Sequence, residues 1–132
     1  MIGLDTNVLV RYLTQDDQIQ AAQANTVIEN CTNNAVTILI NSIVLCELSW
    51  VMLGAYKISK TEFAALLEKL LLTAEFEIED RNYVWQALSD YRSNKAGFAD
   101  ALIGRKNIGM GCKFSYSFDA NCCLLTTFKE QR

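Results

Sequence analysis

Short apolar runs alternate along the chain with longer segments in which apolar residues recur at helical spacing. The runs at residues 1–4, 35–40, 76–78 and 113–118 predict strands, and residues 122–125 form a weaker candidate. Strands that alternate with helices indicate an α/β domain with a mostly parallel sheet. The predicted helices lie after Asp5, from residue 16 or 17 to about 31, and over residues 43–53, 59–72, 80–91 and 98–108.

The helix ends are predicted from capping residues and glycines, because the chain contains no proline. Ser59 and Glu62 have the spacing of a capping box, in which each side chain bonds to the backbone at the other position. Gly54 is the predicted stop of the helix over residues 43–53. The other candidate N-caps are Asp16 or Asp17, Asn41 or Ser42, and Asp80.

Four acidic residues stand alone in segments without other charges: Asp5, Glu47, Asp100 and Asp119. Glu47, for example, is the only charged residue between Glu29 and Lys57. An ionised carboxylate is costly to bury without a charge partner or a metal, so we expect Glu47 to point into a lined cavity. Asp5 and Asp119 each follow an apolar strand, and the ends of parallel strands share one edge of a sheet. The four acids are therefore candidates for one shared site.

Each acid also has a structural interpretation. Asp5 or Asp119 alone could form a turn or cap a helix. Asp100 could stabilise the first turn of its helix by interacting with the helix dipole. Glu47 could form a buried ion pair with an arginine. Four such coincidences are less expected than one common site.

The residue types favour a site for a hard divalent cation. The chain has no histidine, and its five cysteines form no C-x-x-C pair, so we expect free, mostly buried thiols and neither a zinc site nor a histidine-activated nucleophile. Carboxylate oxygens suit Mg²⁺ or Mn²⁺, which can activate water for phosphodiester hydrolysis. A net charge of −3 is unusual for a protein that binds nucleic acid, but bound cations reverse the local sign.

Length and hydropathy indicate a single cytoplasmic domain. A chain of 132 residues is the size of one domain, here residues 1–132. The start MIGLDTN has neither the basic region nor the apolar core of a signal peptide. The apolar stretches are too short to span a bilayer.

Four segments together resemble the PIN-domain family, and the match is closest to the VapC toxins of type II toxin–antitoxin systems. These segments are IGLDTNVLVRYL, SIVLCELSWVM, GFADALIG and SYSFDANC, in this order along nearly the whole chain. The resemblance implies a three-layer α/β/α sandwich and RNA cleavage that depends on Mg²⁺ or Mn²⁺. It also implies that Asp5, Glu47, Asp100 and Asp119 are the catalytic metal ligands, that an antitoxin covers the site, and that the protein is a homodimer.

The same resemblance assigns supporting roles. Thr6 would support the site through its hydroxyl group, Asn7 would orient the first acid, and Ser117 is the polar residue two positions before the last acid. The tail ANCCLLTTFKEQR, which follows Asp119, departs from the aromatic or basic residues that the family pattern has there. The basic residues that could follow RNA phosphates, or be ordinary surface charges, are Arg11, Arg92, Lys95, Arg105 and Lys106.

Other functions fit parts of this pattern. A phosphatase with an aspartyl nucleophile also begins with a strand followed by an acidic residue. Its chemistry usually requires a second acidic residue two positions later, where this chain has Asn7. An RNA-processing nuclease without an antitoxin and a non-catalytic interaction module of the same fold remain alternatives. An antitoxin would bind in a groove beside the site, and the candidate anchors are Trp50, Leu53, Tyr56 and residues 70–72, which could equally be core.

Overall fold

A computed structural model gives the fold, and it describes residues 1–130. The first half contains β1 (Ile2–Gly3), α1 (Thr6–Thr14), α2 (Gln18–Asn33), β2 (Ile38–Ile40), α3 (Ser42–Gly54) and α4 (Lys60–Leu72). The second half contains β3 (Phe76–Ile78), α5 (Arg81–Ser93), α6 (Phe98–Gly109), β4 (Ser115–Ser117), the 3₁₀ helix η1 (Cys122–Leu124) and β5 (Phe128–Glu130).

Side-chain caps set most helix starts where the sequence predicts them. The Ser59–Glu62 capping box forms in both directions. Asp80 differs, because its backbone is left-handed with φ 55° and its side chain makes no capping bond. Its carboxylate pairs instead with Lys106 of α6 at 2.9 Å. The remaining caps are Asp5 on Val8, Asp17 on Gln20 and Asn41 on Val44, each through the backbone N–H.

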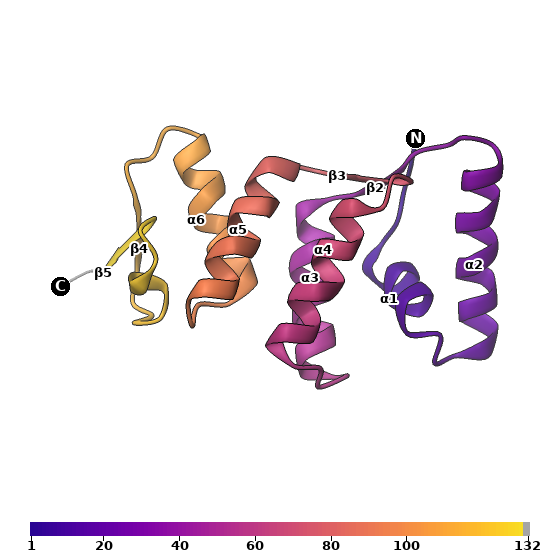
Figure 1. Cartoon of the computed structure of the whole chain (residues 1–132), viewed down its shortest axis with the longest axis horizontal. Helices are drawn as coiled ribbons and strands as arrows, with labels where there is room; N and C mark the ends of the chain where they lie inside the picture. Colours follow the sequence, from indigo (N-terminus) through magenta and orange to yellow (C-terminus); the bar gives the residue numbers. More distant parts are fainter. Residues whose placement is uncertain (131–132) are drawn as a thin grey trace.

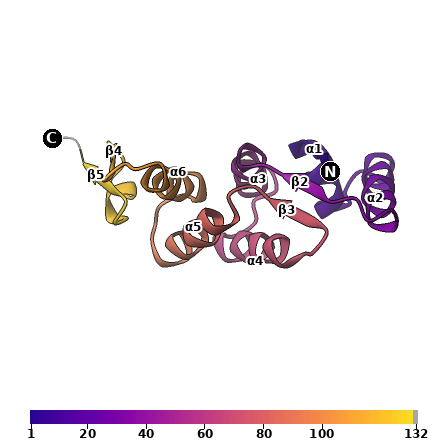
Figure 2. The same cartoon turned by 90° about the horizontal axis from the view of Figure 1, so that it is seen from above.

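The strands form two separate parallel sheets. One has the order β1-β2-β3, and the other pairs β4 with β5. The prediction of parallel strands alternating with helices is confirmed, but the strands do not form one continuous sheet. Figures 1 and 2 show the β4–β5 pair at the opposite end of the molecule from β1 and α2, with α5 and α6 between them.

An aromatic cluster holds the middle of the molecule together. Phe63 of α4, Tyr91 of α5 and Phe98 of α6 are buried and pack edge to face, with ring centroids 6.0–6.3 Å apart. Such contacts stabilise a fold beyond the area that they bury. These contacts fix the start of α6, where Asp100 lies, against α4 and α5.

Residues 122–125 do not form the predicted strand. The N–H of Cys123 donates to the carbonyl of Asp119 and that of Leu125 to the carbonyl of Cys122, so the backbone is helical and η1 forms. The strand lies later in the chain, as β5. Its charged residues lower the hydropathy of this segment, so the hydropathy pattern does not predict a strand there. Within the described residues, no helix is long and apolar enough to cross a membrane.

The free cysteines are less buried than expected. Cys31 and Cys122 are buried and Cys46 and Cys123 are half-buried, but Cys112 is exposed after α6. The prediction of mostly buried thiols is therefore wrong for Cys112, because it lies in the turn that leaves the helix.

Candidate metal centre

Asp100 and Asp119 meet at the junction of α6 and β4. One carboxylate oxygen of each residue and the Sγ atom of Cys122 lie within 4.8 Å of one another. Asp100 is half-buried, Asp119 is exposed and Cys122 is buried. The structure thus brings two of the four predicted acids together and adds a cysteine.

The start of α6 favours a negative charge at Asp100. Its N-cap is Gly97, which has no side chain to accept from the free N–H groups of the first turn. Those N–H groups give the helix N-terminus a partial positive charge. Asp100 stands in that first turn, close to this partial positive charge.

A tight turn after β4 positions Asp119. Its Oδ1 accepts the N–H of Asn121 at 2.8 Å, and its own N–H donates to Ser117 Oγ at 3.0 Å. Ser117, predicted to support the site, therefore holds the backbone of Asp119. The described hydrogen bonds leave Oδ2 of Asp119 for a ligand.

Cys122 is a neutral neighbour of the two acids. Burial raises the pKa of its thiol to about 11, and the negative charges of Asp100 and Asp119 act in the same direction. The thiol is therefore protonated at neutral pH. The sequence analysis missed this residue, and its only signal is its position three residues after Asp119.

Asp5 lies outside this cluster. It is exposed, and its Oδ1 accepts the N–H of Val8 at 3.0 Å, which is the capping role considered above. It lines a pocket between α1 and α2 together with Asn7 and Arg11. Asn7 is predicted to orient Asp5, but no hydrogen bond between these two side chains is among those described.

Thr6 supplies an orphaned polar atom next to Asp5. Its side chain is 9% exposed, and its Oγ1 has no hydrogen-bond partner among the described residues. A buried hydroxyl without a partner costs free energy, so such atoms in native proteins often face a water or an ion that completes them. Thr6 therefore fits a site that a ligand completes.

Glu47 is exposed on α3, so the expectation that it points into a lined cavity is wrong. Helix α3 packs with its neighbouring positions Leu45 and Leu48 inward, which turns Glu47 to solvent. The adjacent Cys46 has its thiol pKa raised by burial and by the charge of Asp100. Glu47 thus lies on the helix that faces Asp100 but outside the Asp100–Asp119 cluster.

Most of the basic residues predicted to bind RNA are already paired with acids. Arg105 binds both oxygens of Asp90 at 2.7 and 2.8 Å, and Lys106 binds Asp80. Arg92 pairs with Glu68 at 3.4 Å, whereas Lys95 is exposed. Acid partners neutralise part of the attraction that these side chains would exert on a phosphate.

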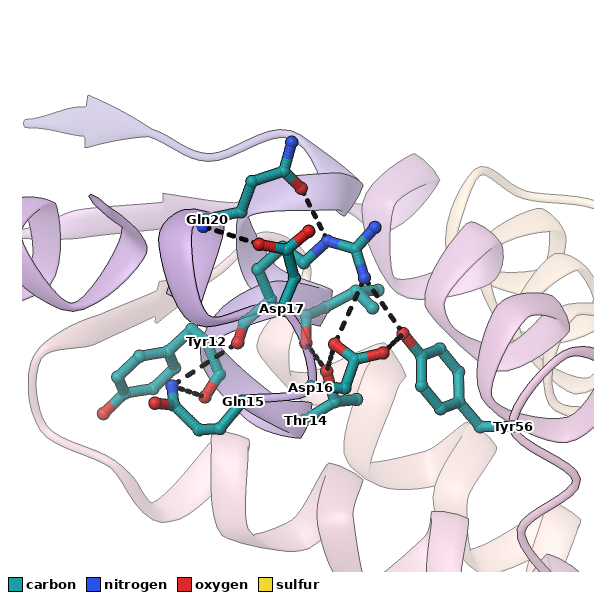
Figure 3. Close-up of polar contacts among 9 residues, drawn as sticks. Tyr12, Thr14, Gln15, Asp16, Asp17, Gln20 and Tyr56 are labelled. Atoms are coloured by element: carbon teal, nitrogen blue, oxygen red, sulfur yellow. Dashed lines mark hydrogen bonds and ion pairs between the residues drawn. The ribbon is translucent and has the colours of Figure 1, made fainter. Parts of the chain in front are cut away.

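Arg11 belongs to a network at the end of α1. It donates to Asp16 at 3.1 Å, to Gln20 at 2.7 Å and to the hydroxyl of Tyr56 at 3.3 Å. Figure 3 shows Asp16 between Thr14 and Tyr56, both of which donate to it at 2.7 Å. These bonds, that from Tyr56 most of all, lower the pKa of Asp16 to about 2.

Replacing Tyr56 with phenylalanine should raise the pKa of Asp16, because its largest stabilising hydrogen bond is lost. A carboxyl group whose pKa is lowered on folding stabilises the fold when the pH is above the ordinary carboxyl pKa of about 3.9. This stabilisation disappears as the pH falls toward 2. The variant should lose less stability over that range than the wild type. A carboxyl-carbon NMR titration measures the pKa, and an unchanged value for Asp16 would contradict the network.

The donor atoms fit a hard divalent cation. Asp100 and Asp119 present carboxylate oxygens within 4.8 Å of each other, and oxygen ligands of this kind are those that Mg²⁺ and Mn²⁺ prefer. The sequence also matches the family model of the PIN domain over residues 2–123. The chain belongs to the PIN-domain family. No curated protein is similar enough in sequence to count as a relative.

PIN domains are generally nucleases that use divalent metal ions such as Mg²⁺. Family membership confirms the predicted α/β PIN-like fold and agrees with a carboxylate metal centre. In this PIN domain Asp100 and Asp119 would hold the ion.

Proposed function

We propose that this PIN domain is an endoribonuclease that depends on Mg²⁺ or Mn²⁺ and serves as the toxin of a type II toxin–antitoxin pair in the cytoplasm. The observation that supports a nuclease best is the meeting of Asp100 and Asp119 at the start of α6. A bound ion would activate water and stabilise the charge that develops on the phosphate.

The residues of the chain would have distinct tasks at this site. Asp100 and Asp119 would hold the ion, and Asp100 lies in the first turn of α6, beside the partial positive charge of the helix N-terminus. Asp5 and Glu47 are proposed as further ligands, with the hydroxyl of Thr6 completing the site. Lys95 is exposed. Of the predicted basic residues it is the best placed to bind a phosphate, because the other four would first have to break an ion pair.

The proposed antitoxin would bind the apolar groove between α3 and α6. This groove has a volume of about 360 Å³ and includes the exposed side chains of Ile43, Trp50 and Ile103. A helix with apolar residues at helical spacing fits such a groove. Of the predicted anchors, Trp50 and Leu72 are exposed, whereas Leu70 and Leu71 are 2% exposed and belong to the core.

The test is cleavage of a labelled single-stranded or loop RNA by the purified protein. We expect cleavage with Mg²⁺ or Mn²⁺, none in EDTA, and recovery when the metal is restored, because the carboxylates need the cation to activate water. Cleavage that persists in EDTA would contradict metal dependence. Intact RNA together with no binding of Mn²⁺ by calorimetry would favour a non-catalytic module.

A further inference from the structure

The β4–β5 pair carries a row of aromatic side chains on one face. Phe114 and Phe118 flank β4, each two residues from Tyr116, and side chains at this spacing stand on the same face of an extended chain. Tyr116 is 64% and Phe118 is 86% exposed. Lys129 of β5 is the register partner of Tyr116, so it belongs to the same face. These four residues are called the aromatic face below.

The opposite face of the pair packs on α6. Asn107 of α6 donates to Ser115 of β4 at 2.8 Å, and the ring of Phe128 of β5 lies beside Gly104 of α6. Ser115 and Phe128 are register partners one position along from the aromatic face, so they point the other way. Figures 1 and 2 show the β4–β5 pair at the end of the molecule, next to α6. The aromatic face is therefore turned away from α6.

Phe114 holds its neighbours on the aromatic face in place. Its ring meets that of Tyr116 edge to face, with centroids 5.2 Å apart. The ammonium group of Lys129 lies 4.3 Å from the centroid of the Phe114 ring, in a cation–π contact. Phe114 itself is half-buried. It thus orders Tyr116 and Lys129, while the rings of Tyr116 and Phe118 remain exposed to solvent.

The aromatic face carries a positive charge, although the net charge of the chain is −3. Within residues 1–130, Lys129 forms no ion pair. The adjacent Glu130 is the register partner of Ser117, on the other face of the pair. A lysine without an acid partner binds a phosphate at no cost in a broken ion pair. The charge on this face therefore complements that of a nucleic acid.

The small area of the aromatic face favours a single strand of nucleic acid over a protein partner. Each of the strands β4 and β5 has three residues. A stable protein interface uses about 800 Å² and roughly 20–30 residues from each partner. An unpaired base needs only one aromatic ring on which to stack, and a neighbouring cation holds the phosphate that follows it.

We propose that the aromatic face is a stacking platform for unpaired RNA bases, with Tyr116 and Phe118 as the stacking rings and Lys129 as the phosphate contact. The choice of RNA rests on the proposed function, whereas the stacking does not. Phe118 directly precedes Asp119, so a base on its ring brings the neighbouring phosphate close to the Asp100–Asp119 cluster. A duplex cannot use this platform, because its bases are stacked on one another.

The first experiment measures binding of a fluorescein-labelled uridylate RNA of about ten nucleotides, by anisotropy in EDTA. Tyr116→Leu and Phe118→Leu keep an apolar side chain without a ring, whereas Tyr116→Phe keeps the ring. We expect each leucine variant to bind about 5- to 150-fold more weakly than the wild type, which corresponds to the loss of one base–aromatic stack. Tyr116→Phe should bind like the wild type. The same RNA annealed to its complement should bind the leucine variants and the wild type alike.

The phosphate contact is tested by the salt dependence of this binding. Lys129→Gln should reduce the slope of log affinity against log salt concentration by about 0.7, the value for one phosphate contact on a single strand. Lys69→Gln is the matched control, since Lys69 is exposed on α4, away from the β4–β5 pair. Equal slopes for the two variants would contradict the role of Lys129.

Two binding results would overturn the platform. One is the absence of RNA binding by the wild type at about 100 µM, the weak end of non-specific affinities for nucleic acids. The other is a leucine variant pair that binds RNA like the wild type, with circular dichroism showing the same fold. Sedimentation velocity tests a protein occupant. A wild-type dimer that Phe118→Ser converts to a monomer would show that a second copy covers the aromatic face instead.

Cleavage kinetics separate failure of the platform from failure of the nuclease assignment. If the platform holds the substrate, Tyr116→Leu should raise KM for single-stranded RNA and leave kcat unchanged, because the metal ligands are intact. RNA cleavage with an unchanged KM would overturn the platform and leave the nuclease in place. Ring-dependent RNA binding without cleavage in Mg²⁺ or Mn²⁺ would support the platform and show that the nuclease assignment is wrong.

Discussion

Asp100→Asn is expected to lower the rate of RNA cleavage by about 100-fold or more, because the substitution removes both a metal ligand and its charge. Asp100 is the better choice than Asp119 because it lies in the first turn of α6, whereas Oδ1 of Asp119 also accepts the backbone hydrogen bond that holds its turn. Asparagine keeps the shape of the side chain, so the fold should remain. Single-turnover cleavage of a labelled RNA at saturating Mg²⁺ measures the effect.

Asp17→Asn is the matched control for this variant. It makes the same chemical change at the N-cap of α2, where asparagine caps a helix about as well as aspartate. Its cleavage rate should equal that of the wild type. Equal rates for Asp100→Asn and Asp17→Asn would show that the acid pair at α6 has no part in catalysis.

Gly104→Ala is expected to destabilise the fold by about 1–3 kcal/mol, as overpacking of a close contact generally does. A Cβ atom at Gly104 would collide with Oγ1 of Thr127 and would lie 2.7 Å from the ring of Phe128. The β4–β5 pair must then move off α6, and Asp119 moves with it. The melting temperature should fall, and so should the stabilisation that Mn²⁺ provides, because ligand stabilisation follows affinity.

Gly54→Ala serves as the comparison. A Cβ atom there meets nothing within 4 Å, and the residue ends α3 in an ordinary helical conformation. Alanine at this position should leave the stability unchanged or raise it by up to about 1 kcal/mol through its higher helix propensity. If Gly104→Ala melted as high as Gly54→Ala, the β4–β5 pair would not depend on close contact with α6.

Local patterns predicted the helices and the inner strands. Ser59 and Glu62 form the expected capping box, and residues 76–78 form β3 as expected, because caps and short apolar runs depend on near neighbours. β5 was missed for the opposite reason. It contains Lys129 and an acid, and only pairing with β4 makes it a strand.

The candidate site was predictable in part. Asp100 and Asp119 were identified because each is an acidic residue that stands alone in a segment without other charges, and the structure brings them together. The same signal misjudged Glu47, because one side of an apolar helix can still face solvent. No local pattern indicates that β1 and β4 belong to two separate sheets, since the division of strands between sheets is decided by long-range packing.

The guanidinium of Arg81 has a consequence for protein quality control. By binding the carbonyls of Leu71 and Phe76, it blunts one side of the sheet against cross-β growth. A further strand that approached β3 would find the outward N–H and carbonyl of Phe76 already bonded, to Thr73 and to Arg81. Arg81 thereby makes fibrous growth from this flank of the three-stranded sheet less favourable.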